Sequence, residues 1–170
     1  MNIRNTILSF VISFALHSSS FSQSSELIDK LPSTKEEFVN SEKKVIATIN
    51  WLEDTPLDQD TGKRKAQYAL FVAWLINSPT VSIEVNPKIL SFTKKNSELL
   101  VIFMGGWTKY CLENNYSSDK VKCNLSGVKS AIKVYKKDIG IKKDKAMERL
   151  IELENKGELE KWITDQLTQK

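Results

Sequence analysis

Apolar residues fill the segment from Leu99 to Leu112, with few polar positions on any side of a helical wheel. A surface helix has one apolar stripe, whereas a helix that is apolar all round must be covered on several sides. The segment therefore predicts a buried central helix at about residues 97–113, with other helices packed around it.

Two further helices are predicted upstream. Two overlapping capping boxes in residues 33–37 precede an apolar stripe and predict a first helix from about Lys35 to Asp54. The uncharged run from Tyr68 to Ile76 predicts a second, largely buried helix at about 63–77. Residues 81–85 alternate briefly but have no partner strand, so we expect a connector that lies against the core.

Downstream, proline, glycine and capping residues divide the chain into shorter helices. We expect a short helix after Asn86-Pro87, a long one capped by Ser118 and ended by Gly140, one from Asp144 to about Asn155, and a closing helix after Gly157. The pattern predicts an all-α fold, a single compact domain of five to seven antiparallel helices around the buried central helix. The domain spans residues 33–168, after a flexible lead-in at 23–32.

The long helix after Ser118 has three faces. An apolar seam keeps a 4-3-4-3 spacing and comprises Val121, Leu125, Val128, Ile132 and Tyr135. A small-residue face comprises Cys123, Gly127, Ala131 and Val134, and a basic stripe comprises Lys122, Ser126, Lys129, Lys133 and Lys136. The lysine stems could simply cover the edges of the apolar seam with their heads in water. The alternative hypothesis is an anion-binding surface formed by Lys122, Lys129, Lys133 and Lys136.

Residues 1–22 have the composition of a secretory signal peptide. Arg4 precedes an apolar stretch of about eleven residues, and Ser20 and Ser22 fit the small-residue pattern for cleavage before Gln23. That stretch is too short to span a membrane, so we expect an exported protein, periplasmic or secreted, with no membrane span after cleavage.

Cleavage would also remove His17, the only histidine in the sequence. Catalytic triads, Cys-His pairs and histidine zinc sites each need an imidazole, so the mature chain would lack all of them. No cofactor fingerprint or metal-ligand cluster stands out, so we expect no cofactor and no metal. The net charge of +4 is too small to indicate nucleic-acid binding, for which a concentrated basic face is typical.

Two glycines interrupt the central helix at Gly105 and Gly106. Each costs a helix about 1 kcal/mol relative to alanine, so something must favour the absence of a side chain there. One interpretation is close approach of a neighbouring helix. The other is a ligand that passes over the bare backbone beside Trp107 and Tyr110, which would make these four residues a binding site.

The two cysteines, Cys111 and Cys123, flank the turn after the central helix. In an oxidising compartment they could form a disulfide. The bond requires that the small-residue face of the next helix meet the central helix; if the apolar seam does so instead, the sulfur atoms stay apart.

Three segments carry a resemblance to a known family: Trp51–Leu57, Ser78–Val81 and above all Glu98–Asn114. There the chain resembles a family of small exported all-helical bacterial proteins that has no assigned activity. The resemblance covers most of the mature chain and implies export and a compact helical domain. It implies no functional residue.

The sequence therefore favours an exported helical module that works by binding, without catalytic machinery. Its partner would be a protein or a small molecule in the cell envelope or outside the cell, and its oligomeric state stays open. The alternative is a carboxylate-based envelope hydrolase acting on glycans, since paired Asp and Glu chemistry needs no histidine. Glu84, Glu98 and Glu113 lie near apolar segments and are the candidates for such an acid.

Overall fold

The protein is described here from a computed structural model that places residues 26–168, so the predicted signal peptide lies outside the described residues. Within 26–168 there are six α-helices, one 3-10 helix and no strand, which confirms the all-α class. The elements are α1 (Lys35–Asp54), α2 (Thr61–Asn77), η1 (Ile89–Lys94), α3 (Glu98–Glu113), α4 (Lys120–Tyr135), α5 (Lys145–Asn155) and α6 (Leu159–Thr168). No helix in this part of the chain is long and apolar enough to cross a membrane.

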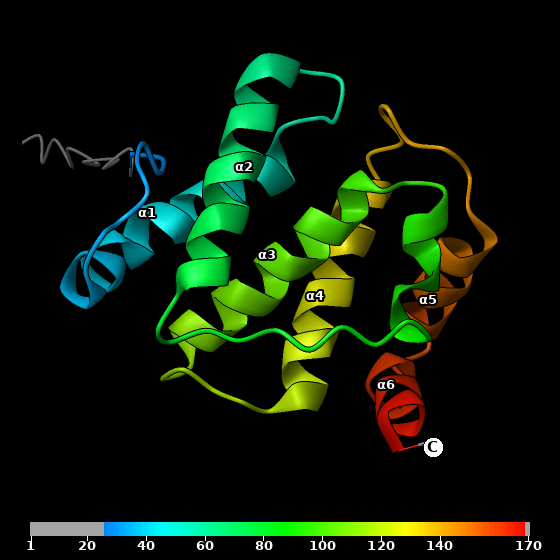
Figure 1. The fold of residues 1–170 in the computed structure, drawn as a ribbon. Coiled ribbons are helices and arrows are strands. Elements are labelled where there is room, and N and C mark those ends of the chain that lie inside the picture. Colours follow the sequence, from blue (N-terminus) through cyan, green and yellow to red (C-terminus); the bar gives the residue numbers. More distant parts are fainter. Residues whose placement is uncertain (1–25, 169–170) are drawn as a thin grey trace, which may run out of the picture.

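Helices α3 and α4 form an antiparallel pair at the centre of the molecule (Figure 1). The small-residue face of α4 meets α3, because a Cβ at Gly127 would lie 2.7 Å from the carbonyl oxygen of Phe103. Cys123 and Ala131 on the same face are fully buried. The apolar seam of α4 is buried as well at Val128 and Ile132, while α5 and α6 pack against α4.

The glycine pair of α3 lies beneath neighbouring helices. A Cβ at Gly106 would lie 2.7 Å from the carbonyl oxygen of Ser126 on α4, and one at Gly105 would lie 3.1 Å from the Ile49 side chain on α1. The close approach of the α4 backbone thus accounts for the absence of a side chain at Gly106, while a Cβ at Gly105 would press on the Ile49 side chain.

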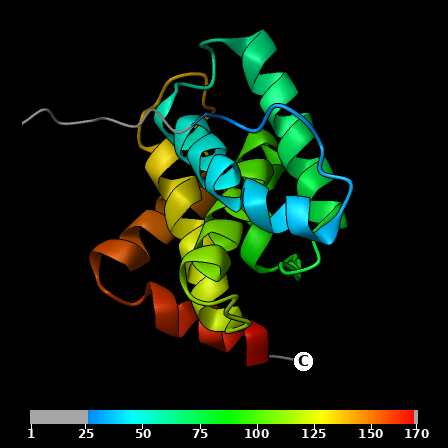
Figure 2. The same ribbon diagram turned by 90° about the vertical axis from the view of Figure 1, so that its left-hand side faces the viewer.

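Helix α2 is less central than the sequence predicts. Turned by 90° (Figure 2), α2 lies at one edge of the molecule beside α1, while α5 and α6 lie at the opposite edge. Phe71 and Trp74 are fully buried, but Ile76 in the same uncharged run is 77% exposed. An uncharged run records only that side chains are apolar; how many sides are covered depends on where the helix docks.

The long helix α4 is shorter at both ends than expected. Asp119, not Ser118, is the N-cap, and its carboxylate accepts a hydrogen bond from the Lys122 amide at 3.0 Å. The helix ends at Tyr135, well before Gly140, and Asp138 adopts a left-handed backbone conformation (φ 55°). An aspartate tolerates this conformation better than most residues, so the chain can turn there without glycine.

The segment before α1 differs from the expected flexible lead-in. Ile28 is 1% exposed, and its amide donates a hydrogen bond to Thr48 Oγ1 of α1 at 2.9 Å. Lys44 of α1 forms ion pairs with Glu26 and Asp29, at 3.5 and 3.2 Å. The folded domain therefore begins before residue 33, anchored by the buried Ile28 side chain and by the ion pairs of Lys44.

Candidate functional site

A groove of about 370 Å³ follows the solvent side of the α3 and α4 pair, and we call it the α3–α4 groove. Its α3 wall carries Lys109, Tyr110 and Glu113, and Glu53 at the end of α1 lines it from the third side. Its α4 wall consists of polar and basic residues with one leucine: Lys122, Leu125, Ser126, Lys129, Ser130 and Lys133.

The helical period explains why these α4 residues line one groove. Lys122, Ser126, Lys129 and Lys133 follow one another at intervals of three or four, so their side chains lie on one face of the helix. Three of the four lysines of the predicted anion-binding stripe thus meet in the groove. Lys136 lies outside its lining and pairs with Glu154 of α5 at 2.8 Å.

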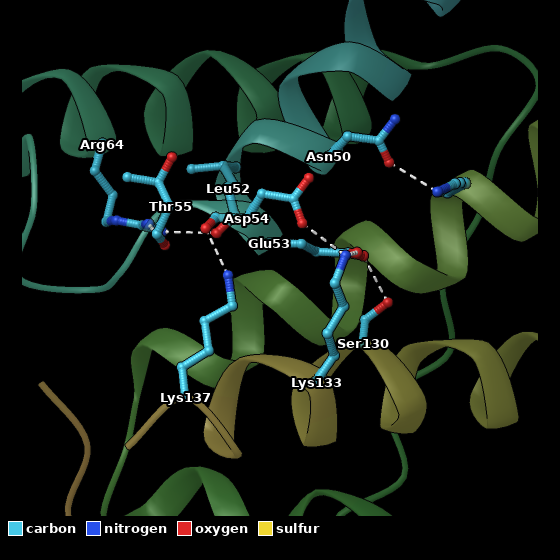
Figure 3. A network of polar contacts seen from close by, with 10 residues as sticks. Asn50, Leu52, Glu53, Asp54, Thr55, Arg64, Ser130, Lys133 and Lys137 are labelled. Atoms are coloured by element: carbon cyan, nitrogen blue, oxygen red, sulfur yellow. Dashed lines mark hydrogen bonds and ion pairs between the residues drawn. The ribbon is translucent and has the colours of Figure 1, made fainter. Parts of the chain in front are cut away.

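One lining residue of the groove, Glu53, is a buried carboxylate that bonds to α4 (Figure 3). Glu53 is 4% exposed, and it accepts hydrogen bonds from Ser130 Oγ at 2.7 Å and from Lys133 Nζ at 3.0 Å. Lys133 also pairs with Asp54 at 2.8 Å. Burial lowers the pKa of the Lys133 ammonium, but hydrogen bonds and charge from Asp54 and Glu53 outweigh this effect and raise that pKa above its ordinary value. This lysine is therefore held in place as a cation, tying α4 to α1.

A buried guanidinium fixes the other side of the α1 terminus (Figure 3). Arg64 of α2 is 3% exposed, and it donates hydrogen bonds to the carbonyl oxygens of Leu52, Thr55 and Pro56. Carbonyl groups at a helix C-terminus carry partial negative charge and lack partners within the helix, so a cation is favourable there. Arg64 thereby holds the end of α1, and with it Glu53, in position.

Most cations of the α3–α4 groove already have a polar partner. Lys122 pairs with Glu160 of α6 at 2.7 Å, and the hydrogen bond that Lys122 donates to this carboxylate raises the Lys122 pKa. Lys109 donates to Asn50 Oδ1 at 2.7 Å. Lys129 is exposed, and within residues 26–168 it makes no hydrogen bond or ion pair. Lys129 is thus the groove lysine best placed to meet an incoming anion.

The predicted ligand residues divide between the core and the groove. Gly105, Gly106 and Trp107 are buried in α3, under α1 and α4. Tyr110, one turn further on, lines the α3–α4 groove. The structure therefore brings Tyr110 together with the lysine stripe. In the sequence, Tyr110 and the lysines belong to two separate hypotheses, a ligand site and an anion-binding surface.

The two cysteines, one on α3 and one on α4, lie side by side as buried free thiols. Their Sγ atoms are 3.5 Å apart, with Cys111 3% exposed and Cys123 fully buried. Burial raises the pKa of both thiols, that of Cys123 to about 12. The small-residue face of α4 brings the two thiols together, but their sulfur atoms are not at the distance of about 2 Å that a disulfide bond has.

The carboxylates proposed for a hydrolase are exposed and dispersed over the connector and α3. Glu84 pairs with Lys120 at 2.8 Å, and Glu98 is exposed at the first turn of α3. Glu113 is also exposed but lines the α3–α4 groove. A catalytic acid is typically partly buried in a cleft, so none of the three has the environment that the alternative function needs.

Neither Glu53 nor Arg64 was predicted as a site residue from the sequence, although both extend an apolar stripe. Glu53 follows Ile49 by four residues, and Arg64 precedes Phe71 by seven, so each lies on the buried face of its helix. In each case the helical period assigns a charged residue to the core. This pattern could have indicated from the sequence that Glu53 and Arg64 are buried.

Within residues 26–168, no group of three or more His, Cys, Asp or Glu side chains is placed to hold a metal ion. Comparisons of the chain with protein-family models, with curated proteins and with solved structures find no match.

Proposed function

We propose that the protein is an exported helical binding module whose α3–α4 groove takes a ligand with anionic groups, without catalysis. The observation that carries this proposal is the convergence of Lys109, Lys122, Lys129 and Lys133 beside Tyr110 in one groove of about 370 Å³. That volume is within the range of small-molecule sites, which combine an apolar wall with a few placed polar groups. The ligand is a free small molecule or an acidic segment of a protein partner.

The contacts that hold the walls of the groove together favour a binding role over a catalytic one. Its buried carboxylate, Glu53, is occupied by Ser130 and Lys133, so it serves to hold the helices together. The exposed Lys129 is left to contact a ligand, because Lys122 and Lys133 are already paired with carboxylates. A groove built on two packed helices is also rigid, which lowers the ordering cost of binding.

The test is an NMR titration of the mature protein, labelled with ¹⁵N, with citrate and with pyrophosphate as anionic probes. We expect the largest shifts at Tyr110, Ser126 and Lys129, and a Lys129→Gln variant should bind at least fivefold more weakly. Lys65→Gln removes the same charge from an exposed position on α2 and is the matched control. Shifts confined to other surfaces, or equal affinity of the Lys129→Gln variant, would contradict the proposal.

Export is a proposal that rests on the leader pattern of residues 1–22. Expression in a bacterium followed by cell fractionation and N-terminal sequencing tests it. We expect the mature chain to begin at Gln23 and to leave the cytoplasm. A chain that keeps Met1 and stays in the cytoplasm would refute export.

We also propose that Cys111 and Cys123 form a disulfide in the exported protein. The thiols are adjacent, and a bond requires a further approach of about 1.5 Å. Because both thiols are buried with raised pKa values, we expect the bond to form during folding, before the helices close over them. It would form by exchange with a disulfide-bearing oxidant of the export compartment, which takes up the two electrons and two protons and leaves as a dithiol. The exported protein should be about 2 Da lighter than the fully reduced chain by intact mass, whereas two thiols that alkylate after unfolding without reductant would show that the bond is absent.

A further inference from the structure

A second groove, of about 470 Å³, lies between η1, α5 and α6, on a different part of the molecule from the α3–α4 groove. We call it the η1–α5–α6 groove. Lys88 and Ser91 line it from the η1 side, Lys145 and Arg149 from α5, and Trp162 and Gln166 from α6. The packing of η1 and α6 against α5 brings these residues together from segments up to about eighty positions apart in the chain.

The lining of the η1–α5–α6 groove carries three cations and no carboxylate. The acidic residues on the neighbouring turns have partners elsewhere. Glu148 accepts a hydrogen bond from the Tyr135 hydroxyl at 2.8 Å, Glu152 pairs with Lys156, and Asp165 pairs with Lys161 at 3.1 Å. Lys145 and Arg149 in this groove thus differ from Lys122 and Lys133 of the α3–α4 groove, which are already paired with carboxylates.

The cations on α5 are placed where they cost helix stability. Lys145 and Arg149 are one turn apart, at positions i and i+4, where like charges repel each other. Lys145 is also the first residue of α5, and a positive charge there opposes the helix dipole. Within residues 26–168 neither side chain forms an ion pair that would relieve this repulsion. A bound anion would relieve it.

The remaining lining groups indicate what else the ligand carries. Trp162 is half-buried and presents an aromatic surface beside the cations, and such surfaces stack against rings. Ser91 and Gln166 add hydroxyl and amide groups that can bond to ring substituents. A guanidinium such as that of Arg149 binds a carboxylate or phosphate through two parallel hydrogen bonds.

From these observations we infer that the η1–α5–α6 groove binds a small ligand in which an oxyanion, phosphate or carboxylate, is attached to a sugar-sized ring. The oxyanion lies between Lys145 and Arg149, and the ring lies against Trp162. This site is independent of the α3–α4 groove, so either can fail its test while the other stands.

Tryptophan fluorescence of the full mature protein tests the inference, with a Trp162→Phe variant to identify the signal of this residue. The probes are glucose 6-phosphate and glucuronate, with glucose as the neutral control. We expect at least one anionic probe to change the Trp162 signal and glucose to leave it unchanged. A response to the phosphate ester alone, or to the carboxylate alone, identifies which oxyanion the groove takes.

Matched variants locate the binding. Arg149→Gln should weaken the binding of the responsive probe at least tenfold, which is the loss of about 1.4 kcal/mol. Lys43→Gln, on the exposed side of α1, removes the same charge and should have no effect. The inference is overturned if neither anion alters Trp162 fluorescence at 10 mM, if glucose binds equally well, or if Arg149→Gln binds as the parent does.

Thermal unfolding tests the site without any ligand. Since Lys145 is unfavourably placed in the empty groove, Lys145→Gln should raise the midpoint of thermal unfolding by roughly 1–3 °C at low salt. Lys43→Gln should leave it unchanged. A lower midpoint for Lys145→Gln would show that the cation stabilises the empty protein, and would contradict a site built to receive an anion.

Discussion

Gly106 of α3 lies directly against Ser130 of α4, so closely that a Cβ at Gly106 would overlap Ser130 Oγ. The same Cβ would be 2.7 Å from the carbonyl oxygen of Ser126, whose hydroxyl donates a hydrogen bond to the Gly106 carbonyl at 2.8 Å. The two central helices therefore meet backbone to backbone, and the residue that permits this is a glycine in a helix interior.

Replacement of Gly106 by alanine should destabilise the protein despite the better helix propensity of alanine. We expect a net loss of about 1–3 kcal/mol in the free energy of unfolding, because the Ser126 backbone cannot move aside without separating α4 from α3. Leucine at this position should cost more. Urea denaturation of the variants measures the effect.

Gly62 provides the matched control, since a Cβ there would meet nothing within 4 Å. Gly62→Ala in the first turn of α2 should stabilise the protein by up to about 1 kcal/mol. If Gly106→Ala also stabilised the protein, α3 and α4 would not approach each other as closely at Gly106 as the structure indicates.

Arg64 should be among the polar residues that contribute most to stability. Arg64→Ala removes the donors to three carbonyl groups at the end of α1, and we expect a loss of about 2–3 kcal/mol. Arg64→Lys should restore little, because an ammonium cannot reproduce the planar fork of donors. Lys65→Ala, at the exposed neighbouring position, should change the free energy of unfolding by less than about 0.5 kcal/mol. Equal effects at the two positions would show that the Arg64 contacts are unimportant.

Local signals in the sequence predicted the helices that have a complete cap. Thr34 accepts from the Glu37 amide at 3.2 Å and begins α1, and Asp144 accepts from the Ala146 amide at 2.7 Å and begins α5. These interactions join residues two or three apart, so they are visible in the sequence. The exposure of Ile76 and the burial of Ile28 depend on how segments dock, which no local pattern records.

The same distinction applies to the two grooves. The lysine stripe of α4 was predictable because one helix carries it. Its partners were not, because Glu53 comes from α1 and Glu160 from α6. The approach of Trp162 to Arg149 follows from the packing of α6 on α5 and could not be derived from either helix alone.

Ile28 should anchor the segment before α1. We expect Ile28→Ala to cost about 2–4 kcal/mol, because the side chain is fully buried and its loss leaves a cavity beside α1. Leu31→Ala is the control, since Leu31 lies in the same segment but is 41% exposed. Thermal unfolding of the parent protein and both variants measures the difference. An Ile28→Ala protein as stable as the parent would mean that the folded domain starts at α1.

The reduced protein should lose stability in alkaline solution through its buried thiols. Burial raises the pKa of Cys123 from an ordinary 9.0 to about 12, so the folded state keeps a proton that the unfolded chain releases near pH 9. The stabilisation due to this proton is complete below pH 9 and is lost as the pH rises from 9 toward 12, at up to about 1.4 kcal/mol per pH unit.

A Cys123→Ala variant isolates this contribution, because it retains the lysines and tyrosines that titrate in the same range. Urea denaturation under reducing conditions at pH 7.5, 9 and 10.5 gives the free energy of unfolding of both proteins. We expect the parent to be the more stable at pH 7.5, where its thiol fills the space beside Cys111, and its advantage to shrink steadily above pH 9. A constant difference between the two proteins across this range would show that the Cys123 thiol ionises as readily in the folded state as in the unfolded chain, and that α3 and α4 do not close over it.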